Sequence, residues 1–199
     1  NRSLASLLPL FLRHYPKIQD LANAEIDQLR SLWAGLGYYS RVVNLQKAAQ
    51  KIVADFGGKF PSALMDLRSL PGIGPYTAGA IASIAFDANV PAIDGNLERV
   101  IARLIAYPKI AKNAPEILNF ANELTAFGEA GSVNQALMDL SSSICTAKNP
   151  KCEICPLAEF CEARKQKIAA TLPIKAVKKA KVELEARAIL IFHAKNWSK

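Results

Sequence analysis

The sequence predicts an all-α protein, and three observations on its 199 residues support that fold class. Apolar residues recur at helical spacing in nearly every segment up to about residue 143. No segment before residue 186 alternates apolar and polar residues in the way that a half-buried strand does. A turn rich in glycine and proline, residues 70–75, separates two short helical segments, which is typical of two helices joined in a hairpin.

The first two helices follow from apolar periodicity and from residues that favour helix starts. Leu4–His14 carries apolar side chains three and four residues apart, which fall on one face of a helix. Asn23 or Asp27 can begin a second helix that includes Trp33, because both side chains can accept hydrogen bonds from the free amides of a helix N-terminus.

A third helix is expected over residues 41–56, where apolar side chains again fall on one face. Gly57 and Gly58 end it, since glycine readily adopts the left-handed backbone that closes a helix. Between the second and third helices, residues 33–41 form a link that two glycines loosen and that carries two tyrosines and an arginine.

The hairpin is the stretch around which the chain is organised. Residues 61–70 are expected to form its first helix and residues 77–86 its second. Gly72 and Gly74 can adopt backbone angles that side chains forbid, so the turn can be tight and can approach a partner closely. Pro75 suits the start of the second helix, which needs no amide hydrogen there. The free amides and the positive end of the helix dipole would form a phosphate site, unless the turn is simply a packing joint.

Three more helices are expected in the second half of the chain. A turn-rich stretch, residues 90–96, leads to a helix with apolar residues from Leu97 to Ile105 on one face. Two further helices are expected near Ala114–Phe127 and Val133–Ser143. Only Ala186–Phe192 has the composition of a strand, which suggests that a domain of a different class begins there.

The net charge of +8 is concentrated in one segment near the end of the chain. Seven lysines and arginines lie between Arg164 and Lys181 with no acidic residue among them, so the remainder is nearly balanced. Either a nucleic-acid partner or a solvated linker accounts for such a run. No apolar stretch approaches membrane-spanning length and no secretory signal is visible, so an intracellular protein is expected. It would be cytoplasmic unless a segment before Asn1 carries a nuclear or organellar address.

All four cysteines of the chain fall in one short segment, separated by six, two and five residues: Cys145, Cys152, Cys155 and Cys161. Clustered thiols in an intracellular protein favour a metal site over disulfides. Four thiolates suit either zinc or an iron–sulfur cluster, and spacing chemistry alone does not choose between them. Lys148 and Lys151 lie between the first two cysteines, where they would contact phosphates or form an ordinary solvated loop.

Three motifs in this order along the chain resemble the helix-hairpin-helix, iron–sulfur superfamily of DNA glycosylases that includes endonuclease III. They are the hairpin Leu70–Gly79, the Asp94-Gly95-Asn96 turn and the cysteine loop. Within that superfamily the chain is most similar to the adenine glycosylases of the MutY type. The stretches that carry this likeness are Leu36–Arg41 with Asn44-Leu45, Ile93–Asn96 and Asn134–Leu140. The resemblance covers about residues 1–173.

The resemblance implies a two-subdomain helix-hairpin-helix glycosylase fold over residues 1–163, with the hairpin at about 61–86. It also implies that the four cysteines of the loop 145–161 hold a 4Fe–4S cluster, which in this superfamily is structural or redox-active and is not the excision catalyst. A basic linker, residues 164–182, would lead to residues 183–199. These would be the first strand of a truncated, Nudix-like α/β domain, which in the MutY family recognises 8-oxoguanine.

The reaction implied by the resemblance is hydrolysis of the N-glycosidic bond of adenine mispaired with 8-oxoguanine or guanine in double-stranded DNA. The base must leave the stack before its sugar bond can be attacked. By resemblance, Asp94 is the carboxylate that stabilises the oxocarbenium-like sugar, although an aspartate at this point is also a favourable helix cap. Asn96 would position Asp94 or the attacking water, or serve only as a turn residue.

Tyr76 determines the reaction class that the resemblance implies. Superfamily members that also cleave the strand carry a lysine at this place, whose amine forms a Schiff base with the sugar. A phenol cannot form one, so a monofunctional enzyme is expected, unless Tyr76 only packs on the hairpin. Tyr38 matches the residue that wedges into the duplex, with packing as its alternative role. Gly72, Ile73 and Gly74 are the hairpin residues expected to contact DNA.

One departure from the family concerns the general acid, a glutamate on a helix that would precede Asn1. The chain is therefore expected to be a fragment that binds DNA better than it cuts it. Glu98 lies one helical turn beyond Asp94, but the resemblance does not assign it that task. The alternatives are a thymine or uracil mismatch glycosylase of the same superfamily and a non-catalytic DNA-binding module. A monomer with no membrane partner is expected in either case.

Overall fold

The computed structural model describes residues 4–174 of the 199-residue chain. Within that range the protein is helical and contains no β-strand, and one isolated parallel bridge joins Ile110 to Ile174. The all-α prediction is thereby confirmed for the described residues. The strand expected at 186–192 lies outside them. No helix between residues 4 and 174 is long and apolar enough to cross a membrane.

Ten α-helices and two short 3₁₀ turns follow one another along this range. Their bounds are α1 (Leu4–His14), α2 (Ile18–Ala22), α3 (Ile26–Leu32), α4 (Ser40–Phe56), α5 (Leu64–Ser69), α6 (Pro75–Ala85), α7 (Gly95–Leu104), α8 (Pro115–Ala126), α9 (Ala130–Ser143), η1 (Cys152–Ile154), η2 (Ala158–Phe160) and α10 (Glu162–Lys165).

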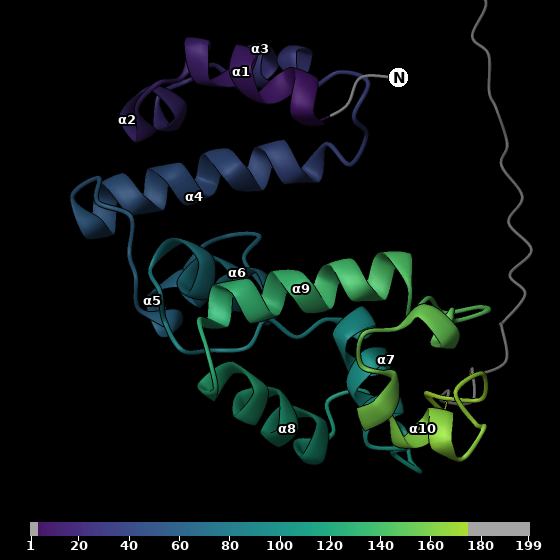
Figure 1. Ribbon diagram of the computed structural model, residues 1–199. Coiled ribbons are helices and arrows are strands. Elements are labelled where there is room, and N and C mark those ends of the chain that lie inside the picture. The colour runs from purple at the N-terminus through teal and green to yellow at the C-terminus, as the bar shows by residue number, and fades with distance from the viewer. Residues whose placement is uncertain (1–3, 175–199) are drawn as a thin grey trace, which may run out of the picture.

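Helix α4 is the central member of the first group of helices. Figure 1 shows α1, α2 and α3 on one side of α4, with α5 and α6 on the other. Leu29 and Val42 are fully buried in the core between α4 and the helices before it. Ile52 and Leu67 lie in a second core, between α4 and the hairpin helices. The two faces of α4 therefore join the N-terminal helices to the hairpin.

The second group packs around α9, which is contacted by α6, α7 and α8 (Figure 1). Leu97 and Val100 on α7 share a core with Leu137 and Leu140 on α9. Another core joins the outer face of α7 to α8 through Ile101 and Ile117. Because α9 contacts both α6 and α7, it holds the hairpin and the helix that begins after Asp94 in a common frame.

Several helix boundaries differ from the sequence-based expectation. Helix α2 was not predicted, because five residues are too few for an apolar period to emerge. The residue that precedes α3 is Glu25, so neither Asn23 nor Asp27 begins it. Helix α5 begins three residues later than expected, because Ala63 is still extended. The predicted helices at Leu4–His14 and 41–56 are confirmed, with the second beginning one residue earlier.

Residues after the cysteine loop return to the body of the protein. Ala163, Ala169 and Leu172 are buried together, and α10 contacts α7. The basic segment expected at 164–182 therefore begins on this packed surface, and its residues from 175 onward lie outside the described range.

Candidate functional site

Asp94 lies at the N-terminus of α7 and caps it. One carboxylate oxygen, Oδ1, accepts hydrogen bonds from the backbone N–H groups of Asn96 and Leu97, each at 2.9 Å. The other oxygen, Oδ2, accepts from the side-chain amide of Asn96 at 2.8 Å. The cap and the candidate catalytic role of Asp94 are thus compatible, because the helix N-terminus fixes the direction of the carboxylate and favours its negative charge.

A hydrogen-bonded relay runs from Asp94 through Asn96 to Arg99. Asn96 Oδ1 accepts from the Arg99 guanidinium at 2.9 Å. The same guanidinium donates to the carbonyls of Cys145 and Ser141, both at 3.0 Å. Burial lowers the pKa of Arg99, and the charge of nearby Arg103 lowers it further. The relay connects the Asp94 carboxylate to the first cysteine of the metal-ligating loop.

The turn of the hairpin is tight at only one of its two glycines. Gly72 has φ +81°, and a Cβ there would lie 2.8 Å from the Asn44 side chain of α4. Gly74 does not use the freedom expected of it, because its φ is −84° and a side chain would have open space. Pro75 occupies the first position of α6, as the sequence predicts. Ile73 donates its backbone N–H to Leu70 and closes the turn.

A groove lies between α4 and the hairpin turn. Arg41 and Asn44 line it from α4, and residues 71–73 and Thr77 line it from the hairpin. The amides at the N-terminus of α6 have no carbonyl one turn earlier, so this end of the groove offers donors and a positive dipole. The arrangement can hold an anionic group such as a phosphate.

Tyr38 stands out from the link before α4. Its side chain is 75% exposed and its backbone has φ +48°, an uncommon conformation for a tyrosine. The link is fixed by Trp33, whose indole N–H donates to the Gly37 carbonyl at 3.1 Å. Arg41 lies over the Tyr38 ring, 5.0 Å from its centre. An exposed ring on a fixed, strained turn can stack on a partner at little cost in conformational freedom.

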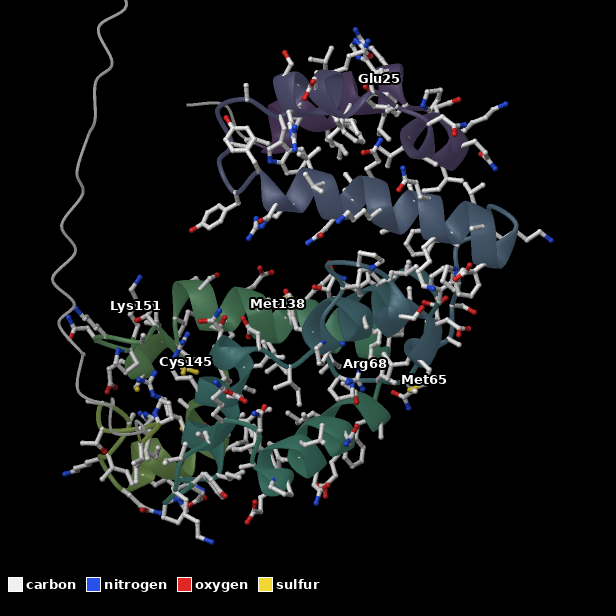
Figure 2. All side chains as sticks on the ribbon, turned by 180° about the vertical axis from the view of Figure 1, so that it is seen from behind. Glu25, Met65, Arg68, Met138, Cys145 and Lys151 are labelled. Atoms are coloured by element: carbon white, nitrogen blue, oxygen red, sulfur yellow. The ribbon has the colours of Figure 1, made fainter. Side chains whose placement is uncertain are left out.

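Tyr76 connects the hairpin to α9. Its hydroxyl donates to the Met138 sulfur at 3.4 Å, which orients the ring at the start of α6. In Figure 2, Met138, Cys145 and Lys151 follow one another along α9 and the loop beyond it. Tyr76 is 37% exposed, so it is neither buried in the core nor free in solvent.

The four cysteines line one small cavity. Arg103 also lines it and is 2% exposed, with donors to the Cys145 sulfur at 3.4 Å and to the carbonyls of Thr146 and Leu172 at 2.8 and 3.0 Å. Burial raises the pKa of the Cys152 thiol, and the other three cysteines raise it further. A thiol must lose its proton to bind a metal, so a cationic group that binds here would displace the proton of Cys152.

The chemistry of the donor set fits an iron–sulfur cluster. Four cysteines from one short segment line the same cavity, and four thiolates are the usual ligands of such a cluster. Lys148 and Lys151 are exposed on the loop between the first two ligands, and Figure 2 shows Lys151 at its outer edge.

Other polar residues have different places. Glu98 accepts a hydrogen bond from the backbone N–H of Asn113 at 2.9 Å, so it braces the turn before α8. Arg99, Arg103 and Asn134 are buried contributors that sequence reasoning missed. Their spacing on α7 and α9 resembles that of ordinary polar-face residues, and, apart from the bond of Arg99 to Asn96, their partners lie 42 or more residues away. Only the quoted likeness over Asn134–Leu140 was a signal that included one of them.

Two family models match this chain. Residues 1–126 match the model described as HhH-GPD superfamily base excision DNA repair protein. Residues 145–161, which include all four cysteines, match the model described as the iron–sulfur binding domain of endonuclease III, and this match supports a 4Fe–4S cluster.

Sequence relatives are named adenine DNA glycosylase. One, from Buchnera aphidicola subsp. Schizaphis graminum (strain Sg), is 40% identical over 181 residues, which cover 89% of this chain and 52% of the relative. Another, from Homo sapiens, is 41% identical over 160 residues, covering 78% of this chain and 29% of the relative. The chain therefore spans about half the length of the first relative and less than a third of the second.

Solved structures with the same fold include a thermostable thymine-DNA glycosylase, with a TM-score of 0.75 and 27% identity over 80% of this chain and 75% of that one. A non-covalent endonuclease III–DNA complex superimposes with a TM-score of 0.67 and 22% identity, over 81% of this chain and 76% of that one. The second likeness concerns the fold alone. The two-subdomain helix-hairpin-helix prediction is confirmed by these matches.

Proposed function

This chain belongs to the HhH-GPD superfamily of base excision DNA repair proteins, and we propose that it carries the catalytic region of an adenine DNA glycosylase. The observation that supports this most is the Asp94 carboxylate, held by Asn96 at the start of α7 in a chain 40% identical to an adenine DNA glycosylase. The substrate would be double-stranded DNA with adenine opposite 8-oxoguanine or guanine. The protein would act inside the cell, as a monomer.

In the proposed reaction the adenine leaves the stack and its N-glycosidic bond breaks, while water supplies the hydroxyl that ends on the sugar carbon. Positive charge develops on the sugar as the bond breaks. Asp94 would stabilise that charge, and it needs no reorganisation to do so because three hydrogen bonds already fix its carboxylate. Asn96 would hold Asp94 in place, since its amide donates to Oδ2.

Tyr76 supports hydrolysis without strand cleavage. A lyase step would need an amine at this position to form a Schiff base with the sugar, and a phenol offers none. Its hydroxyl is already engaged with the Met138 sulfur, so Tyr76 links the start of α6 to α9. We therefore propose a monofunctional glycosylase.

Contacts with DNA would come from three places on the surface. The hairpin turn of Gly72, Ile73 and Gly74 would approach a phosphate; its two glycine amides would donate, since the Ile73 amide is bonded to the Leu70 carbonyl, and the N-terminus of α6 would add its dipole. Exposed Tyr38 would insert beside the target base. Lys148 and Lys151 would pair with phosphates from the cysteine loop.

The iron–sulfur cluster would be held by the loop behind α7 rather than at Asp94. When bound, it supplies four covalent attachments within a 17-residue segment, and it is a redox group. The loop's carbonyls accept from Arg99 and Arg103, so an ordered loop would in turn fix α7. We assign the cluster no part in bond breaking.

The test is single-turnover cleavage of a duplex with adenine opposite 8-oxoguanine by the full-length protein. Its Asp94→Asn variant should lose at least about a hundredfold in rate, the scale of removing a preorganised electrostatic group. Asp27→Asn, an exposed carboxylate on α3, is the matched control and should cleave normally. Strand breaks should need alkali. Breakage without alkali would exclude the assignment of Tyr76, and an active Asp94→Asn enzyme would exclude that of Asp94.

A second candidate is a thymine mismatch glycosylase, favoured by the structural likeness to the thymine-DNA glycosylase at 27% identity. The same assay with thymine opposite guanine separates the two. Thymine release faster than adenine release would favour the second candidate. Tight binding of both duplexes without release of either base would favour a non-catalytic DNA-binding module.

A further inference from the structure

Asn134 on α9 is fully buried, and its side-chain amide grips the segment that leads to Asp94. Its Oδ1 accepts from the backbone N–H of Ala92 at 3.0 Å, and its Nδ2 donates to the Val90 carbonyl at 3.0 Å. The second Nδ2 hydrogen bond goes to the Ser83 hydroxyl of α6 at 2.9 Å. One amide therefore pairs with an extended segment, as a neighbouring strand would, and also ties that segment to α6.

The same segment, residues 90–92, also packs closely against α6. A Cβ at Gly79 would lie 2.5 Å from the Pro91 carbonyl oxygen and 3.2 Å from Ala92 Cα. Where α9 crosses α6, a Cβ at Gly131 would lie 2.7 Å from the Ser83 carbonyl oxygen. The segment at 90–92 is thus held between a bare stretch of α6 backbone and the amide of Asn134.

The hydrogen bonds of Asp94 fix its carboxylate relative to α7. They do not fix the position of the start of α7 relative to the hairpin. Ala92 is only two residues before Asp94, so the grip on residues 90–92 sets that relation. The bond to Ala92 is the costliest to remove, because it would leave the buried Ala92 N–H without its partner.

We propose that Asn134 is the positioning residue of the site: its amide fixes residues 90–92 against α6 and thereby sets where the Asp94 carboxylate stands relative to the hairpin turn. This inference rests on the proposed function for its effect on rate. Its structural part, the clamp, stands independently. Asn134 lies on α9 between Gly131 and Met138 and needs no contact with the substrate for this role.

Two variants test the clamp. Asn134→Leu has a similar shape and removes all three hydrogen bonds. Asn134→Asp keeps an acceptor for the Ala92 N–H but loses both donors, so it separates the bond to Ala92 from those to Val90 and Ser83. It also provides a second variant if Asn134→Leu does not fold. Asn122→Leu, at an exposed asparagine of α8, controls for the substitution itself.

A control for general destabilisation is needed because a buried amide also contributes to stability. Leu29→Ala removes volume from the core between α3 and α4, outside the clamp. Each variant is made in the full-length, cluster-loaded protein and its midpoint of thermal unfolding is recorded. Excision rates are then compared at equal distance below that midpoint, so that stability loss alone is matched.

Function and local structure are measured separately. The functional measurements are the single-turnover excision rate and the dissociation constant for duplex DNA. With Asn134→Leu the rate should fall at least about tenfold while the dissociation constant changes less than about threefold, because the hairpin and the exposed contacts are intact. The structural measurement is hydrogen exchange in peptides spanning residues 88–94 of the DNA-free protein. Exchange of the Ala92 amide should accelerate about tenfold or more, and less in Asn134→Asp.

The outcomes separate the two proposals. A rate loss in Asn134→Leu no larger than that in Leu29→Ala would overturn the positioning role, as would unchanged exchange over residues 88–94. A wild-type protein that releases no adenine would overturn the proposed function, and the exchange measurement would still decide the clamp. Equal losses of rate and of DNA affinity would mean that Asn134 only holds the fold together.

Discussion

At the scale of single residues, the candidate site is built from side chains whose partners are mostly backbone. Asp94 accepts from two amides of its own helix, and Arg99 donates to the carbonyls of Ser141 and Cys145. Backbone groups in packed helices and loops move little, so such partners fix a side chain more firmly than exposed ion pairs would. Preorganisation of this kind is what stabilises charge at a transition state.

Arg99 provides a test of the relay. Arg99→Gln removes the donors to Ser141 and Cys145 and weakens the hold on Asn96, so the Asp94 carboxylate should lose part of its fixed orientation. We expect the single-turnover excision rate to fall about tenfold, or roughly 1.4 kcal/mol. DNA affinity should change little. Arg30→Gln, at an exposed arginine paired only with Asp27, is the control. An Arg99→Gln rate equal to that of the control would show that the relay is dispensable.

The candidate site could be predicted in part from its residues. The Asp94 cap follows from an aspartate before Gly95-Asn96 and an apolar helix, and the structure bears out the cap. Arg99 and Arg103 could not be predicted, because a pattern of helix faces assigns arginines to solvent. Both arginines donate to the carbonyl of Cys145, which lies 46 residues after Arg99 and 42 after Arg103, and only tertiary packing brings it there.

At the scale of elements, two glycines allow close backbone contacts of α6. Helix α6 has a low density of large side chains; Gly131 of α9 meets the α6 backbone at Ser83, and Gly79 of α6 meets the segment 90–92 at Pro91 and Ala92. These close contacts place the segment that leads to Asp94 between α6 and α9. The hairpin itself was predicted, with the Pro75 start confirmed, whereas Gly74 proved to be an ordinary extended residue. Boundaries at α5 and α9 differ by three residues because no strong capping residue marks their starts.

Gly79→Ala tests the close contact between α6 and the segment 90–92. At an open helix position this change should stabilise the protein by up to about 1 kcal/mol, since alanine has the higher helix propensity. Here a Cβ would clash with the Pro91 carbonyl oxygen, so we expect a loss of about 1–3 kcal/mol instead. The measurement is denaturant unfolding followed by circular dichroism. Gly128→Ala, where a Cβ would meet only the tip of Val133 at 3.8 Å, should be nearly neutral. Stabilisation by Gly79→Ala would mean that the contact between α6 and the segment 90–92 is looser than described.

At the scale of the whole molecule, the cysteine loop closes the structure. It joins the end of α9 to α10 and residues 163–172, and it surrounds the guanidinium of Arg103 with carbonyl oxygens. A buried cation needs such partners, since burial without them is strongly unfavourable. Loop order and the stability of α7 are therefore coupled, and a cluster held by the four cysteines, as proposed above, would help to order the loop.

Removal of the cluster should accordingly weaken more than the loop. Cys155→Ser should lose iron and its visible absorbance, and the midpoint of thermal unfolding should fall by roughly 4–8 °C, equivalent to about 2 kcal/mol in a domain of this size. Ser142→Ala, an exposed change at the end of α9, should alter neither property. Iron content, absorbance and thermal unfolding are measured on the same samples. Iron loss with an unchanged midpoint would mean that Arg103 keeps its partners without the cluster.

The close backbone contacts at Gly79 and Gly131 have a consequence in genetics. Every single-nucleotide missense change in a glycine codon introduces a residue that has a Cβ atom. At Gly79 and Gly131 that atom would lie 2.5 and 2.7 Å from a backbone carbonyl oxygen, which no rotamer can relieve. Missense changes in these two codons should therefore destabilise the protein, and under the proposed repair function they should be found among alleles with raised mutation rates.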